Sequence, residues 1–253
     1  MERVQFKNSR GLTLVGTMFE AGSDAAIILA HGFTSDKSSL GRFDALAEAL
    51  NRLGYNVLAF DFSGCGESDP EILSSQKMVD DLRSAITHVC GKGRTRVALY
   101  GHSLGGLICL RCSSPEVVTI IASSTATDSM NYNWEEYYSR DQLAELAQKG
   151  YFRANDRTGK ERLIGLQMLK DFEEISQAEL MKNVTCPVLL IHGNNVKDKE
   201  ELQLLERSQR GMSLLPQGSE LEIVKSADHT YFGHWDKVIA IAGEWYSKHL
   251  PVF

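Results

Sequence analysis

The stretch "LYGHSLGG" at residues 99–106 places a serine between two glycines in the pattern G-x-S-x-G. It follows an apolar run and precedes a helical pattern, so Ser103 should lie on a sharp turn between a strand and a helix. Such a turn strains the backbone, and the small neighbours Gly101 and Gly105 leave room for it. We predict that Ser103 is the catalytic nucleophile and that the N–H of Leu104 is one oxyanion donor.

Apolar runs of strand length alternate with helical patterns on both sides of this turn. The expected strands are 12–19, 25–30, 56–62, 96–101, 117–124, 186–193 and 221–226. The expected helices are 45–54, 76–90, 140–149, 199–208 and 234–249. This alternation predicts one α/β domain over 1–253, with a mostly parallel, doubly wound sheet and helices on both faces.

Residues 125–180 interrupt the alternation. This segment is too long for an ordinary connection, and we interpret it as an inserted cap with secondary structure of its own, including a hairpin around Asp156–Gly159. Aromatic residues gather at its start: Tyr132, Trp134, Tyr137 and Tyr138. They indicate either an apolar or aryl acyl site or the packing of the cap onto the body of the protein.

A second oxyanion donor is expected in the loop after the strand 25–30. That loop reads "HGFTSDKSS", and the backbone N–H of Phe33 is the natural candidate. The pairing of H-G-F with G-H-S-L-G-G is more specific than either motif alone.

Five motifs spread over the chain resemble those of the α/β-hydrolase superfamily. They are HGF (31–33), DFSGCGES (61–68), GHSLGG (101–106), CPVLLIHG (186–193) and ADHTY (227–231). Within that superfamily the chain resembles small bacterial carboxylesterases of the cinnamoyl or feruloyl esterase type and related serine aminopeptidase and monoacylglycerol lipase-like enzymes. The resemblance implies an α/β-hydrolase fold with an eight-stranded sheet and a small cap over the acyl pocket. Relatives often carry arginine at the position of Ser63, a difference that we expect to change local packing only.

The catalytic base should be a histidine that follows the nucleophile and the acid in the chain. His229, in "KSADHTYFGHW", lies between the last expected strand and the final helix, so it can reach over the sheet edge to Ser103. His234 is the rival, but it falls at the start of the final helix. We predict that His229 is the base and that Asp228 is a loop carboxylate with no part in catalysis.

The acid is where this sequence departs from the resemblance. Relatives carry it four residues after the histidine of the His-Gly motif, and that position is Val196 here. The nearest carboxylate is Asp198, which a longer loop could deliver to the same place or which could cap the next helix in a D-x-x-E box with Glu201. Asp128, after the strand 117–124, is a third option, and the absence of a functioning acid is a fourth. We predict Asp198.

These residues predict a serine hydrolase that cleaves carboxylic esters, with short acyl or aryl (hydroxycinnamoyl) groups, through an acyl-enzyme. The same machinery could instead hydrolyse thioesters or small peptides. Because Val196 occupies the expected acid position, a weakly active or non-catalytic ligand-binding protein is a further alternative. A Ser–His pair that lacks its acid can lose about 10⁴ in kcat, by the precedent of serine proteases.

The composition limits the partners. The formal net charge is −6 and no basic block is present, which argues against nucleic acid, and no apolar run approaches the roughly 20 residues of a membrane span. Five scattered cysteines and a start without an apolar leader favour a cytoplasmic protein. Cys109 and Cys112 form C-x-x-C without a second ligand pair, so we expect no metal and no cofactor. The partner is a small-molecule ester, and a homodimer is compatible with the sequence.

Overall fold

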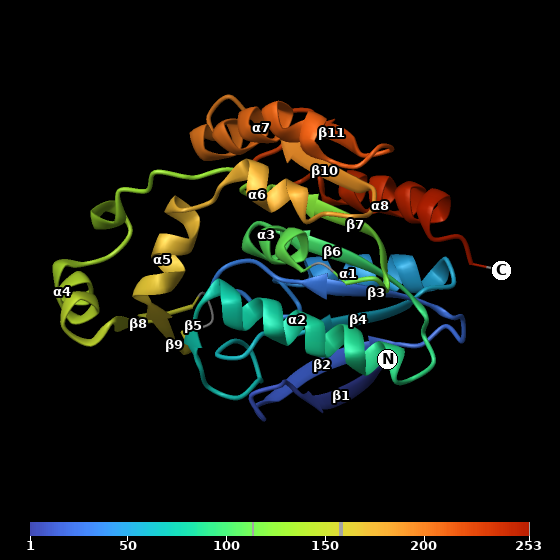
Figure 1. Ribbon diagram of the computed structural model, residues 1–253, viewed down its shortest axis with the longest axis horizontal. Coiled ribbons are helices and arrows are strands. Elements are labelled where there is room, and N and C mark those ends of the chain that lie inside the picture. The colour runs from blue at the N-terminus through green and yellow to red at the C-terminus, as the bar shows by residue number, and fades with distance from the viewer. Residues whose placement is uncertain (113, 157–158, 253) are drawn as a thin grey trace.

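An eight-stranded sheet forms the centre of the computed structural model, which describes residues 1–112, 114–156 and 159–252 (Figure 1). The strand order is β1-β2-β4-β3-β6-β7-β10-β11, and β2 is antiparallel to both of its neighbours while the other pairs are parallel. The strands are β1 (Glu2–Lys7), β2 (Thr13–Phe19), β3 (Ala25–Ala30), β4 (Asn56–Phe60), β6 (Arg96–His102), β7 (Val117–Ser123), β10 (Val188–Gly193) and β11 (Glu220–Val224). The mostly parallel eight-stranded sheet expected above is therefore confirmed.

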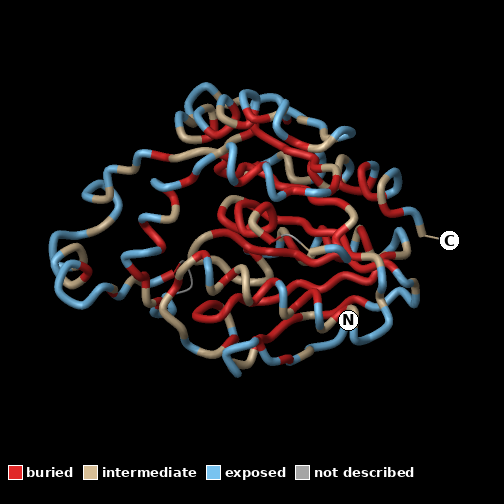
Figure 2. The backbone as a smooth tube through the Cα atoms, viewed as in Figure 1, coloured by how far each residue is buried: buried red, intermediate tan, exposed pale blue. Residues whose placement is uncertain are grey.

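Helices cover both faces of this sheet, and each face has its own apolar core. On one face, Phe43 of α1 (Arg42–Arg52) belongs to the same core as Trp245 of α8 (Trp235–His249). The other core joins α2 (Ser75–Cys90), α3 (Leu104–Arg111), α6 (Gln177–Lys182) and α7 (Lys199–Gly211). The central strands are buried between these layers (Figure 2), which explains why they are apolar on both faces.

Part of the segment 125–180 lies to one side of the sheet, at the left of Figure 1. Its elements are the 3₁₀ turn η1 (Trp134–Glu136), α4 (Arg140–Lys149), β8 (Tyr151–Asn155), β9 (Glu161–Gly165) and α5 (Leu166–Glu173). Strands β8 and β9 are antiparallel, and β9 also pairs with β5 (Ile72–Leu73) of the main body. Asp156 and Lys160 flank the turn expected around Asp156–Gly159, whose residues 157 and 158 lie outside the described part of the chain.

Strand β1 was not expected from the sequence. It is an edge strand with largely exposed side chains, so it lacks the apolar run that marked the central strands. The predicted helix 45–54 begins earlier, at Arg42, because Gly41 has a left-handed conformation and ends the preceding loop. Over the described residues, no helix has the length and apolar character needed to cross a membrane.

Candidate active site

Ser103 lies on the sharp turn between β6 and α3 that the sequence predicts. Its backbone has φ 55° and ψ −121°, a conformation that side-chain-bearing residues rarely adopt. The two glycines are required because a Cβ at Gly101 would lie 2.3 Å from the carbonyl oxygen of Gly105, and a Cβ at Gly105 would lie 2.0 Å from that of Ala30. The Ser103 N–H donates to the Ser123 carbonyl at 2.8 Å, which ties the turn to β7.

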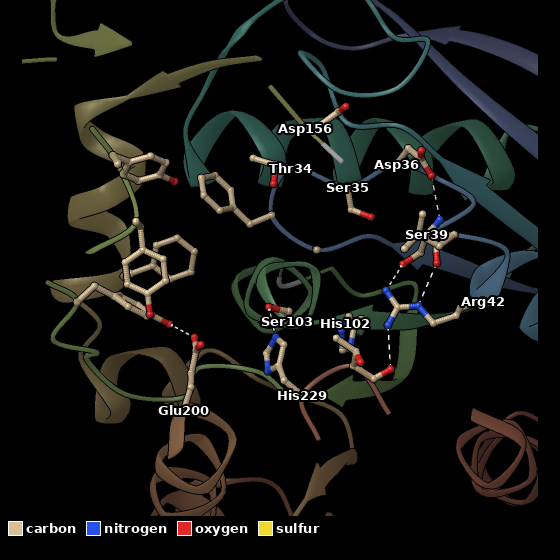
Figure 3. A pocket seen from close by; sticks show the side chains of 18 of the residues that line it. Thr34, Ser35, Asp36, Ser39, Arg42, His102, Ser103, Asp156, Glu200 and His229 are labelled. Carbon is tan, nitrogen blue, oxygen red and sulfur yellow. Dashed lines mark hydrogen bonds between the residues drawn. The ribbon is translucent and has the colours of Figure 1, made fainter. Parts of the chain in front are cut away.

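The structure brings His229 to this serine. Its Nε2 atom lies 3.0 Å from Ser103 Oγ, although the two residues are 126 positions apart in the sequence (Figure 3). His229 lies in the loop between β11 and α8, as expected. The neighbouring Asp228 accepts hydrogen bonds from the N–H groups of Thr230 and Phe232, so its carboxylate holds its own loop. His234, the rival base, places its Nδ1 2.9 Å from the Phe232 carbonyl oxygen in an exposed position.

The carboxylate beside the His229 ring belongs to Glu201, and the prediction of Asp198 is corrected on this point. Glu201 Oε2 lies 3.0 Å from His229 Nδ1. Asp198 instead caps α7, where its Oδ1 accepts from the Glu201 N–H at 3.0 Å. One Asp198 oxygen accepts at the helix cap and the other accepts the His229 backbone N–H, so neither faces the imidazole ring, which is the physical reason for the difference.

Asp198 still contacts His229, but at the backbone N–H and not at the ring. Its Oδ2 accepts the His229 N–H at 2.8 Å, so one residue fixes both the start of α7 and the loop that carries the histidine. Asp128 is remote from this network: its carboxylate accepts from the Ser129 N–H and lies 3.6 Å from the Arg210 guanidinium. Val196, at the position where the resemblance implies the acid, is 82% exposed.

Glu201 is buried and fully supplied with donors. Besides His229, its carboxylate receives the Gly193 N–H and the Ser124 hydroxyl, both at 2.9 Å, and lies 3.0 Å from His192 Nδ1. Burial alone would raise the pKa of Glu201, but the hydrogen bonds with His192 and His229 outweigh burial and lower the pKa to about 2. The group is therefore ionised at neutral pH.

The charge of Glu201 acts in turn on His229. Burial would lower the pKa of this imidazole, but the hydrogen bond and charge of Glu201, together with the charges of Glu200 and Asp198, raise the pKa above its usual value. Because an ionised carboxylate only accepts hydrogen bonds, the Nδ1 atom of His229 must carry a proton. Its Nε2 lone pair then faces the serine, as a general base requires.

The loop after β3 passes directly beside Ser103. A Cβ added to Gly32 would lie 3.5 Å from Ser103 Cβ, and the next residue, Phe33, lines the same cavity as Ser103. Leu104 is the first residue of α3, where an N–H has no partner within the helix. Among the described residues, neither N–H donates to another protein group, which leaves both predicted donors available to an oxyanion.

A buried charge pair anchors the same loop. Lys37 donates to the fully buried carboxylate of Asp61 through its backbone N–H at 2.7 Å and its ammonium at 2.9 Å. The third donor to Asp61 is the Glu67 N–H, and a Cβ at Gly66 would overlap the Asp61 carboxyl group. The motif DFSGCGES thus serves to hold the Phe33 loop against the body of the protein.

A cavity of about 310 Å³ opens above Ser103 and His229. One side carries aromatic rings from the Phe33 loop and the 125–180 segment, and the other carries hydroxyl groups and Arg42 (Figure 3). The aromatic side consists of Phe33, Tyr132, Trp134, Tyr137, Tyr138 and Phe172.

All five cysteines are free thiols, and burial raises the pKa of Cys112 to about 11. The described residues contain no cluster of three side chains suited to hold a metal ion.

Sequence reasoning did not select Glu201, although a signal was present. Glu201, Leu204, Leu205 and Ser208 repeat at the spacing of one helix face, and all four are buried. A glutamate on the buried face of an amphipathic helix needs hydrogen-bond donors, and here the two histidines provide them. The D-x-x-E pattern drew attention to the capping role, whereas only the Asp198 half of that box forms.

An α/β hydrolase is defined by three features that this structure shows. They are the order of the strands in the sheet, the strained serine between β6 and α3, and the loops that meet at that serine. Residues 27–241 match the sequence model of the Alpha/beta hydrolase family, and the chain belongs to that family.

Three similarities extend this result. An uncharacterized 31.7 kDa protein of the traX-finO intergenic region of Escherichia coli is 23% identical over 99% of this chain and 100% of its own length. The palmitoyl-protein thioesterase ABHD10, mitochondrial, of Mus musculus is 29% identical over 74% of this chain and 62% of that protein. The structure of Est1E from Butyrivibrio proteoclasticus with ferulic acid bound is 19% identical, with a TM-score of 0.74 and coverage of 98% of this chain and 99% of that one.

Proposed function

We propose that this hydrolase is a serine carboxylesterase in which Ser103, His229 and Glu201 form the catalytic triad. The observation that carries the proposal is the continuous chain of contacts from Ser103 Oγ to His229 Nε2 and from His229 Nδ1 to Glu201 Oε2, each 3.0 Å long. Nucleophile, base and acid thus stand in the relation that acyl transfer requires. Glu201 replaces Asp198 as the proposed acid.

In this proposal Ser103 Oγ attacks the ester carbonyl while His229 Nε2 takes the hydroxyl proton. The developing oxyanion is bound by the N–H groups of Phe33 and Leu104. His229 then gives the proton to the leaving alcohol. The alcohol departs, and the acyl group stays bound to Ser103 as the acyl-enzyme. Water activated by the same imidazole releases the acid and restores Ser103.

The size and lining of the cavity support a compact acyl or aryl group. A volume of about 310 Å³ lies at the lower end of the range for small-molecule sites, roughly 300–1,000 Å³. A wall of aromatic rings offers an apolar surface for stacking. The similarity to a structure that holds ferulic acid points in the same direction, while the similarity to a palmitoyl-protein thioesterase motivates thioesters as the second substrate class.

The alternative of a non-catalytic binding protein was motivated by Val196. The contact between Glu201 and His229 supports the catalytic alternative, because a carboxylate lies beside the imidazole although Val196 cannot supply one. The deciding experiment is labelling with a fluorophosphonate probe, with mass spectrometry of the labelled peptide. We expect the label on Ser103 in the parent chain and no label in Ser103→Ala; an unlabelled parent chain would contradict the proposal.

Turnover assays then separate the substrate classes. A matched ester, thioester and amide of one aryl acid, each with a chromogenic readout, should show kcat/KM highest for the ester. Turnover of the thioester alone, or of the amide alone, would replace the carboxylesterase assignment by the corresponding class.

A further inference from the structure

One carboxylate stands among the aromatic rings of the cavity. Glu200, in the first turn of α7, accepts a hydrogen bond from the Tyr132 hydroxyl at 2.7 Å (Figure 3). Both residues line the main cavity, and both also line the small space behind Ser103. A glutamate in the first turn of a helix interacts favourably with the helix dipole in any side-chain orientation. The helix dipole therefore does not explain why the Glu200 carboxylate points toward the aromatic rings.

The rings beside Glu200 form a corner. The centroids of Tyr132 and Trp134 are 4.8 Å apart, with planes at 32°. Tyr137 lies 5.9 Å from each of them, at 85° to Tyr132 and 59° to Trp134. All three rings line the cavity, and the face of an aromatic ring, unlike its edge, is electron-rich and attracts a cation.

Glu200 differs from the other carboxylates that line the cavity. Asp156 is paired with the buried guanidinium of Arg162, and Asp36 accepts the N–H groups of Ser38 and Ser39. Among the basic side chains that the structure describes, none lies within ion-pair distance of Glu200. Its charge is therefore available to a ligand in the cavity.

We propose that the corner formed by Tyr132, Trp134, Tyr137 and Glu200 binds a cationic group, namely a quaternary or primary ammonium carried by the substrate. Rings supply the cation–π contact, and the carboxylate supplies a counter-charge in a partly buried place where it is weakly screened. The assignment of an ester substrate rests on the proposed function, but the cation site itself does not.

A binding experiment tests the site without turnover. Choline and its neutral isostere 3,3-dimethylbutan-1-ol are titrated into the Ser103→Ala chain and followed by ligand-observed NMR. We expect choline to bind about tenfold more tightly, and we expect Glu200→Gln in the same background to reduce this preference to about twofold. The glutamine keeps an oxygen that can accept the Tyr132 hydroxyl, so the change isolates the charge.

The matched control is Glu206→Gln, which removes the same charge from an exposed position on the same helix. The preference for choline should be unchanged in that variant. Equal binding of choline and the alcohol by the Ser103→Ala chain, or the same loss of preference in Glu206→Gln and Glu200→Gln, would overturn the proposal.

Matched esters then locate the cation on the substrate. In the first pair, acetylcholine carries the cation on the alcohol part of the ester, and 3,3-dimethylbutyl acetate is its neutral mimic. In the second pair, the 4-nitrophenyl ester of trimethylammonioacetate carries the cation on the acyl part, and the 4-nitrophenyl ester of 3,3-dimethylbutanoate is its neutral mimic. We expect the cationic member of one pair to have a kcat/KM about tenfold higher. Turnover of both pairs without preference for the cation would overturn the cation site alone. Retained choline binding without turnover of any ester would overturn the esterase assignment alone.

Discussion

The Nδ1 atom of His192 lies 3.0 Å from Glu201 Oε1, the carboxylate oxygen opposite to the one that faces His229. Two imidazoles thus bracket one buried carboxylate. On its far side, His192 Nε2 lies 2.9 Å from Ser208 Oγ, so the ring is held at both ends. His192 is fully buried and is not among the residues that line the cavity, yet it contacts the carboxylate that faces His229.

The first prediction concerns the acid. Glu201→Gln should lower kcat for ester hydrolysis by about 10⁴, because an amide can donate to His229 Nδ1 and stabilise the wrong tautomer, as in serine proteases. Steady-state kinetics with one chromogenic ester provide the measurement.

Two variants serve as controls for that change. Asp128→Asn should retain activity within about twofold, and Asp198→Asn should lose less than about tenfold, since asparagine can still cap α7. A loss in Asp198→Asn that equals the loss in Glu201→Gln would return the role of acid to Asp198.

The second prediction concerns the pH profile. His229 works as a base only when it is neutral, and its raised pKa should place the acid limb of kcat/KM above pH 6.5, the ordinary value for histidine. Removing the charge in Glu201→Gln leaves burial as the main influence, so the limb of the residual activity should move to lower pH. A limb at the same pH in both chains would show that Glu201 does not set the pKa of the base.

The third prediction assigns His192 a positioning role. His192→Phe should lower kcat by about 10- to 100-fold with KM changed by less than about twofold, because Glu201 loses one donor and its orientation while the substrate cavity is untouched. His192→Asn places an amide N–H near the position of Nδ1 and should recover part of the loss. If both variants lower stability but leave kcat unchanged, His192 is structural only.

The fourth prediction follows from the ionisation of Glu201. Its pKa is about 2 in the folded chain against an ordinary 4.5, so its contribution to stability is complete above about pH 4.5 and is lost as the pH falls toward 2. The loss should be on the order of 3 kcal/mol. Urea denaturation between pH 5 and 2 should show a smaller decline for Glu201→Gln than for the parent or for Glu206→Gln.

The fifth prediction concerns the anchor of the Phe33 loop. Lys37→Met leaves the buried Asp61 carboxylate without its cation and should cost about 3 kcal/mol of unfolding free energy, with a lower kcat because the oxyanion donor moves. Adding Asp61→Asn should restore part of both losses, since the unpaired charge is removed. Thermal melting and ester kinetics on both variants provide the test, and a double variant no better than Lys37→Met would contradict the role of the charge pair.

Periodicity made most of the fold predictable. The central strands are buried on both faces, and the helices α2, α4, α7 and α8 lie close to the expected ranges because each has one apolar face or a clear cap. The edge strand β1 was missed since exposed side chains leave no apolar pattern. Ser103 and His229 were named from local motifs, and the structure places them within hydrogen-bond distance.

By itself the sequence determined the elbow of Ser103, because Gly101 and Gly105 are the residues that a strained strand-to-helix turn tolerates. Only the tertiary structure decided which carboxylate meets His229. Asp198 and Glu201 are three residues apart, and both are plausible on chemical grounds. The direction in which α7 packs its buried face turns Glu201 toward an imidazole 28 residues further along the chain and leaves Asp198 to cap the helix. Such a contact depends on how a helix and a distant loop meet in space, which no local pattern of residues records.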